Sequence, residues 1–165
     1  QLIINEDART WSFPVDVEPG RNHFVPNQQN RPIGAVATCA GGLADIRAMP
    51  PEGQTEDLLF LSGTDGVVGL VNRARGCITT IKWDSGQLPG CLLWISNGGR
   101  DYYPWNGRVA ALGIEPVASA FDLGVTYSLS AETPLSQKGI ATAVTVSPGR
   151  PLEFKYSITV APDRN

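Results

Sequence analysis

The chain has 165 residues, of which 42% are hydrophobic and 18% are charged, and its formal net charge is −3. These values are typical of a globular protein, and they argue against a nucleic-acid partner, which would require a basic surface. The sequence has no apolar run of about 18 residues, so we expect no membrane-spanning segment.

Glycine and proline are frequent, with 18 and 13 residues, and no long stretch shows the apolar periodicity of an amphipathic helix. Apolar runs instead recur about every 8 to 15 residues between turn sequences, which is typical of antiparallel strands. The sequence therefore predicts an all-β protein, an antiparallel β-sandwich.

The first part of the chain, residues 1–32, is polar and rich in proline, so we expect it to be mostly loop. Short strands are predicted at residues 2–4 and 11–13. A further strand is predicted at residues 34–39, where Gly41 and Gly42 would end it.

The middle of the chain contains the clearest apolar runs. Residues 58–61 and 67–71 flank the turn sequence 63–66, which predicts a hairpin. Residues 77–83 predict the next strand. Residues 91–95 are apolar throughout and bounded by turn sequences, so they predict a central strand.

The last third begins with residues 108–117, a run of small and apolar residues that predicts a buried strand. One helical turn is expected near residues 118–123, followed by strands at 125–130 and 140–146. Residues 152–160 alternate apolar and polar side chains, which predicts a strand with one buried and one solvent-exposed face.

Three cysteines, Cys39, Cys77 and Cys91, lack the spacing of a metal site, and we expect them to be reduced core residues. Reduced cysteines favour a cytoplasmic location. A periplasmic or secreted protein is the open alternative, and it would allow a Cys77–Cys91 disulfide. The single histidine, His23, cannot hold a metal ion alone, so no metal site is expected.

The predicted strand 108–117 carries one carboxylate, Glu115, near its end. An ionised glutamate in an apolar strand costs several kcal/mol unless it is paired or lies in a solvated cleft. Aromatic and polar residues that suit the faces and hydroxyls of a sugar ring lie just upstream. The candidate sugar contacts are Asn97, Asp101, Tyr103, Trp105 and Arg108. The alternative is an edge-strand glutamate in water.

Other roles remain open for some of these residues. Trp94 lies within an apolar run and is expected in the core. Tyr103 and Trp105 precede a turn, where an exposed aromatic pair would form a better sugar platform. Arg108 would either hold a ligand hydroxyl or carboxylate, or pair structurally with Asp101 or Glu115.

The sequence Leu112-Gly-Ile-Glu-Pro-Val117 resembles the strand that carries the general-base glutamate in the aldose 1-epimerase (galactose mutarotase-like) family. The residues leading into it are similar to a bacterial branch of that superfamily. The similar segments are Trp83-Asp84, residues 89–94, Gly98-Gly99, residues 103–105 and Gly107-Arg108, with residues 45–50, 57–61 and 66–72 upstream and 147–154 downstream. The resemblance covers roughly residues 45 to 160.

This resemblance implies a galactose mutarotase-like supersandwich, of which the chain matches the C-terminal half. Residues 1–165 would then be a single β-sandwich domain, or half of a larger one completed by a missing N-terminal half or a second chain. The implied activity is that of an isomerase that interconverts sugar anomers and needs no cofactor.

In that reaction the resemblance implies that Glu115 removes the anomeric proton and that a histidine protonates the ring oxygen. Nothing around His23 resembles the family's catalytic histidine motif, so the acid is expected outside this chain. Two alternatives stay open. One is a non-catalytic protein that binds a sugar or sugar derivative, and the other is a structural β-domain whose aromatic residues contact a partner.

Overall fold

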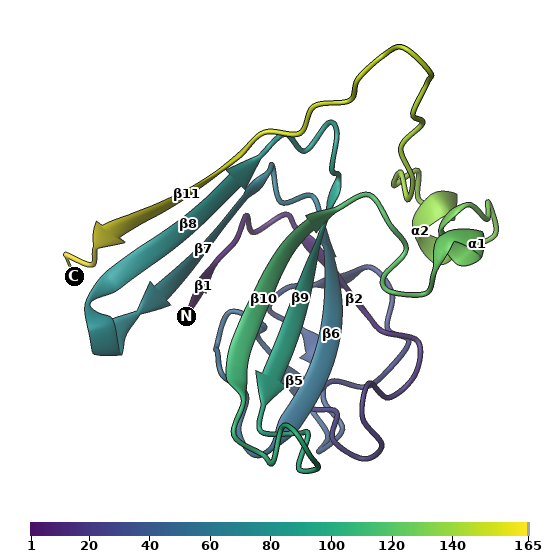
Figure 1. The fold of residues 1–165 in the computed structure, drawn as a ribbon. Coiled ribbons are helices and arrows are strands. Elements are labelled where there is room, and N and C mark those ends of the chain that lie inside the picture. Colours follow the sequence, from purple (N-terminus) through teal and green to yellow (C-terminus); the bar gives the residue numbers. More distant parts are fainter. Residues whose placement is uncertain (165) are drawn as a thin grey trace.

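The computed structural model describes residues 1–164 as two antiparallel sheets that face each other, with little helix (Figure 1). This architecture confirms the all-β prediction. The five-stranded sheet consists, in spatial order, of β10 (Ala110–Val117), β9 (Gly90–Asn97), β6 (Thr55–Ser62), β2 (Arg9–Ser12) and β3 (Arg31–Pro32). The four-stranded sheet consists of β1 (Leu2–Ile3), β7 (Val67–Asn72), β8 (Cys77–Trp83) and β11 (Tyr156–Pro162).

The remaining elements are short. They are a strand pair, β4 (Val36–Ala37) and β5 (Leu43–Ala44), a 3₁₀ turn η1 (Arg73–Arg75), and two helices, α1 (Val125–Ser128) and α2 (Pro134–Gln137). Within residues 1–32, the three strands β1, β2 and β3 are separated by loops. Among residues 1–164, no helix combines the length and hydropathy needed to cross a bilayer.

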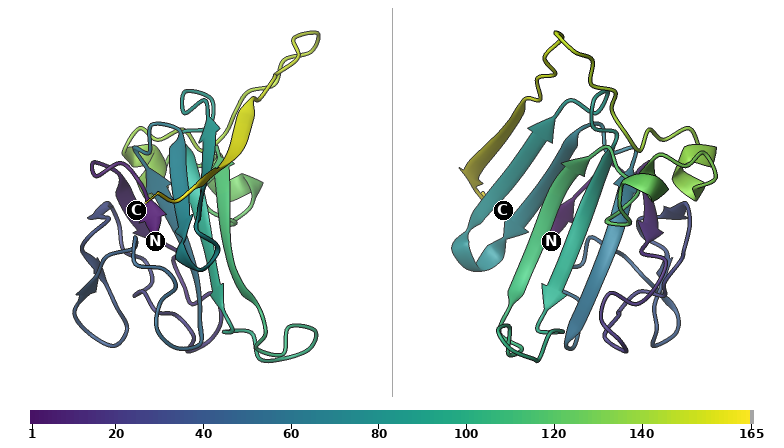
Figure 2. Two further views of the ribbon diagram at one scale, coloured as in Figure 1. Left: turned by 90° about the vertical axis from the view of Figure 1, so that its left-hand side faces the viewer. Right: turned by 45° about the vertical axis from the view of Figure 1, so that its right-hand side comes forward.

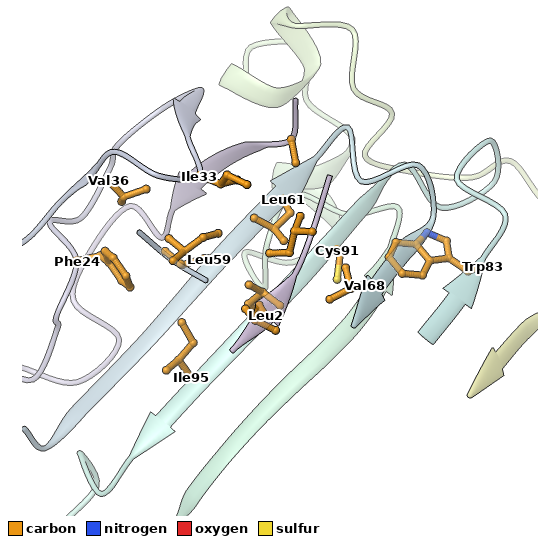
Figure 3. Close-up of a cluster of buried hydrophobic side chains, with 14 residues drawn as sticks. Leu2, Phe24, Ile33, Val36, Leu59, Leu61, Val68, Trp83, Cys91 and Ile95 are labelled. Atoms are coloured by element: carbon orange, nitrogen blue, oxygen red, sulfur yellow. The ribbon is translucent and has the colours of Figure 1, made fainter. Parts of the chain in front are cut away.

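The main core lies between the two sheets (Figure 3). Successive side chains of a strand point to opposite faces, so Leu59 and Leu61 of β6 face the four-stranded sheet while Phe60 faces away from it. Phe60 joins a second apolar cluster with Phe121 and Leu135 on the outer face. Both faces of β6 and β9 are covered by apolar side chains, so the sequences of these two strands are nearly continuous apolar runs.

The hairpin predicted around residues 63–66 does not form. β6 pairs with β2 and β9, whereas β7 pairs with β1 and β8, so the turn carries the chain from one sheet to the other. Gly66 has a φ of +71°, and a β-carbon there would lie 2.3 Å from the Trp83 carbonyl oxygen. The glycines therefore mark a tight turn, but they do not determine whether the two strands that it joins pair with each other.

The helical segments also differ from the prediction. The turn expected at 118–123 lies later in the chain, and the strand expected at 125–130 is α1 and its C-terminal cap. In α2, the Thr133 hydroxyl accepts a hydrogen bond from the Ser136 N–H at 3.1 Å, and Pro134 follows at the first helical position. These residues are N-terminal capping signals for α2, a helix that was not predicted.

Two predicted C-terminal strands were wrong in detail. Residues 140–146 form no strand, and the strand predicted at 152–160 begins only at Tyr156. Every residue of β11 is exposed, so its apolar face is not buried as predicted. The reason is that β11 pairs with β8 at the edge of the four-stranded sheet, where no second layer lies opposite it.

The strand predicted as buried at 108–117 is β10, an edge strand whose residues are partly or fully exposed. The cysteines are all free, so the Cys77–Cys91 disulfide is absent. Only Cys91 is buried as predicted, whereas Cys77 is partly exposed and Cys39 is exposed. Burial raises the pKa of the Cys91 thiol to about 12.

Candidate functional site

The outer face of the five-stranded sheet, which points away from the four-stranded sheet, carries a pocket of about 920 Å³. Its floor comes from neighbouring strands, because Leu58 lies opposite Trp94 and Leu92 lies opposite Glu115 in the antiparallel register. The chain that follows β10 forms the wall. The lining residues are Phe13, Val17, Leu58, Leu92, Trp94, Arg100, Glu115, Ala118, Ser119, Phe121, Asp122, Gly124, Val125, Ser128, Leu129, Thr142 and Ala143. The pocket therefore has an apolar floor and an acidic and hydroxyl-bearing rim.

Glu115 lies at the exposed edge of this pocket, on β10. Within residues 1–164, its carboxylate makes no side-chain hydrogen bond or ion pair. The neighbouring Gly113 points to the same face, and a β-carbon there would lie 2.6 Å from Oε1 of Glu115. The glycine thus leaves the space that the carboxylate occupies, and the carboxylate oxygens are free to accept hydrogen bonds from a ligand.

A second carboxylate, Glu56, is completely buried at the end of the same sheet face. Its Oε1 accepts a hydrogen bond from the Trp94 indole N–H at 2.7 Å, and its Oε2 accepts one from the Ser96 hydroxyl at 2.8 Å. Nε of Arg100 lies 3.3 Å from Oε1. These partners offset the cost of burying the charge, and they fix the orientation of the Trp94 ring.

Arg100 forms the end of the pocket next to this carboxylate. Its guanidinium lies 5.5 Å from the Trp94 ring centroid and 5.3 Å from that of Trp105, so it is placed between two indoles. Nε also lies 3.0 Å from Oε1 of Glu18. Because two carboxylates and two aromatic rings already surround Arg100, its charge is neutralised within the protein.

Glu18 comes from the N-terminal loop and also accepts a hydrogen bond from the Tyr102 hydroxyl at 2.8 Å. This hydrogen bond is the main reason that the pKa of Tyr102 is raised. In the same region, Arg21 and Asp101 form an exposed ion pair at 2.6 Å. The loop 98–109 is thus attached to the loop 14–30 by three polar side-chain contacts.

The sequence anticipated only part of this site. Glu115 lines the pocket, and Trp94 lines it as well, although Trp94 was expected in the core. Sequence reasoning missed Glu56, Glu18 and the position of Arg100. One feature of the sequence could have identified Glu56. It lies two residues before Leu58, so in a strand its side chain points to the same face as the apolar side chain of Leu58.

The five predicted sugar contacts are not gathered in the pocket. Asn97 faces the other side of the sheet and donates hydrogen bonds to the Pro51 and Gly53 carbonyls at 3.0 and 2.6 Å. The other four lie in or beside the loop 98–109. Asp101 pairs with Arg21, Tyr103 is 85% exposed, Trp105 lies against Arg100, and Arg108 is exposed outside the pocket.

His23 does not line the pocket either. It lies in the N-terminal loop, where partial burial lowers its pKa, and its ring packs edge-on against Phe24. The backbone N–H groups of His23 and Phe24 donate to the buried carboxylate of Asp57, at 3.1 and 3.0 Å. Desolvation raises the pKa of Asp57 to about 6 despite these hydrogen bonds. This group therefore anchors the loop to β6.

Residues 1–164 contain no group of three or more His, Cys, Asp or Glu side chains arranged to hold a metal ion. Comparison of the sequence with protein-family models gave no match, and comparisons with curated proteins and with solved structures gave none either. The likeness to the galactose mutarotase-like family thus depends on the motifs quoted above and stays a prediction.

Proposed function

We propose that the protein binds a carbohydrate in the pocket on the outer face of the five-stranded sheet. The observation that carries this proposal is that Glu115 and Trp94 line the same pocket over an apolar floor. The Glu115 carboxylate is available to accept hydrogen bonds from a ligand, and the Trp94 indole is held in position by its hydrogen bond to Glu56. A sugar has apolar C–H faces that pack on such a floor and a hydroxyl rim that donates to a carboxylate. Ser119 and Ser128 add hydroxyls at the wall.

In the finer form of this proposal, Glu115 is the general base of an aldose 1-epimerase-like reaction. It would remove the proton from the anomeric hydroxyl, and a protonated group on the opposite side of the ring would donate to the ring oxygen as the ring opens. Exposure of Glu115 on a strand edge gives a sugar access to its carboxylate. Each such proton-transfer group contributes about 10²–10⁴-fold to the rate.

Carbohydrate binding without catalysis is the second candidate function, and a specific observation favours it. The only histidine in the sequence, His23, lies outside the pocket, and Arg100 is already paired with two carboxylates. Among the described residues, the pocket then contains carboxylates and hydroxyls that can bind a sugar, but no cationic acid to protonate its ring oxygen.

Titration calorimetry with a panel of aldoses tests the binding, and polarimetry on the same sugars tests the catalysis. The Glu115→Gln variant should bind sugar within a few-fold of the unsubstituted protein and lose any acceleration of mutarotation. Glu132→Gln is the matched control, because Glu132 is exposed and outside the pocket. Binding with no acceleration supports the second candidate, and the absence of binding to every sugar contradicts both.

A further inference from the structure

The sandwich is open along one side, because the four-stranded sheet extends past the edge of the five-stranded sheet. Figures 1 and 2 show β8 and β11 lying beyond β10. Within β11, Tyr156, Ile158 and Val160 are 71%, 59% and 67% exposed. Ile158 lies opposite Ile81 of β8, which in turn lies opposite the buried Val68 of β7. Residues directly opposite share a face, so the core face of this sheet continues uncovered onto β11.

A groove of about 940 Å³ runs along the same open side, between the two sheets. Its apolar lining includes Leu70 from β7, Ile95 from β9 and Leu112 from β10. β10 pairs only with β9, so its outer edge is free. A chain segment that added to this edge would therefore place side chains beside the groove, on the side of the molecule where the face of β11 is uncovered.

The protein itself carries a segment of the required kind. Every residue from 143 to 162 is exposed, and Figure 1 shows the chain before β11 rising away from both sheets. Val144 and Val146, and then Leu152 and Phe154, alternate with polar residues. Between them, the Arg150 N–H donates to the Ser147 carbonyl at 3.2 Å, and this is the one backbone hydrogen bond within residues 143–155 of the described chain. The segment thus has the pattern of a two-stranded hairpin without a sheet to join.

We propose that residues 143–155, here called the arm, dock on the open side of a second copy of this chain. The arm adds to the free edge of β10 of the partner, and its valines cover the apolar face of the partner's β11. Each copy has one arm and one open side, so the exchange closes as a two-fold dimer with both sites filled.

The measurement is the mass of the intact 165-residue protein in solution, by light scattering during size-exclusion chromatography over a range of concentrations. We expect twice the chain mass of 17.6 kDa. Substituting Val144→Lys and Val146→Lys together should return the protein to the monomer mass, because both side chains would then place charges against the apolar face of the partner's β11. Both residues are exposed in the single chain, so the fold itself should persist.

Val15→Lys is the matched control, since Val15 is 60% exposed on the loop 14–30, far in sequence from the arm and from β10. This variant should remain a dimer. Hydrogen exchange then locates the contact: the amides of the arm and of β10 should be protected in the dimer and become unprotected in the lysine variant.

Three results would overturn the proposal. A monomer with protected arm amides means that the arm folds onto its own chain. A monomer with unprotected arm amides means that a second copy does not cover the open side. A dimer that persists in the double lysine variant means that another surface holds the two copies together.

Discussion

Replacing Asp57 with asparagine should remove a pH dependence from the stability of this protein. Asp57 is 1% exposed, and its carboxylate accepts the backbone N–H groups of His23 and Phe24. Burial raises its pKa from the ordinary 3.8 to about 6, because desolvation of the charged form outweighs these hydrogen bonds. The folded protein therefore binds a proton more tightly at this site than the unfolded chain does.

The sign and the size of the effect follow from linkage. The contribution of Asp57 to stability is fully present below pH 3.8 and declines as the pH rises toward 6. Above this window the carboxyl group is charged in both states and the contribution stays constant. A shift of this size corresponds to roughly 3 kcal/mol, at about 1.4 kcal/mol per pKa unit.

Urea unfolding between pH 3.5 and 7.5 measures the effect, with the free energy of unfolding compared between the unsubstituted protein and Asp57→Asn. The difference between the two should change by about 3 kcal/mol across the window, in the direction that favours the variant at high pH. Asp7→Asn changes an exposed carboxylate and should retain the dependence on pH. Parallel curves for the unsubstituted protein and Asp57→Asn would refute the reasoning.

Three further predictions concern the pocket and the core. Gly113→Ala should displace the Glu115 carboxylate and weaken sugar binding about 10-fold in calorimetry, with little change in melting temperature because the closest clash is with a flexible side-chain end and the next, with the Trp94 β-carbon at 3.3 Å, is mild; unchanged affinity would contradict this. Glu56→Ala should lower the free energy of unfolding by about 1–3 kcal/mol, because it leaves the buried Ser96 hydroxyl and the partly buried Trp94 indole without their acceptor, while Arg100 keeps its pair with Glu18; no measurable loss in urea unfolding would disagree. A thiol reagent at pH 8 should label the exposed Cys39 in the native protein but label Cys91 only on unfolding; rapid native labelling of Cys91, mapped by mass spectrometry, would count against its burial.

The sequence predicted best those strands whose side chains are buried on both faces. The apolar runs around Phe60 and Leu93 became β6 and β9, because each of their residues packs against a cluster on one face or the other. Such runs predict strands reliably, but they contain no information about which strands pair. The pairing of β6 with β2 and β9 depends on contacts between residues far apart in the sequence.

The C-terminal part could not be predicted in the same way. The alternation of Ile158 and Val160 with polar residues does predict a strand, but not whether a second layer covers it. Likewise, the ion pair of Glu56 with Arg100 joins residues on a strand and on a distant loop, and neither residue alone has a sequence signature. Glu115 was identified because it is the one carboxylate in a predicted apolar strand, but its exposure follows from the edge position of β10, which the sequence does not reveal.

The central claim is that a sugar binds over the five-stranded sheet with its hydroxyls on Glu115. The most direct measurement is a ¹H–¹⁵N spectrum of the labelled protein titrated with aldoses, which follows backbone amides and indole N–H groups together. We predict saturable shifts of the Trp94 indole and of β10 amides near Glu115, with the exposed β11 amides unchanged. Saturable shifts confined to residues outside the pocket, or no shifts with any sugar, would contradict the account.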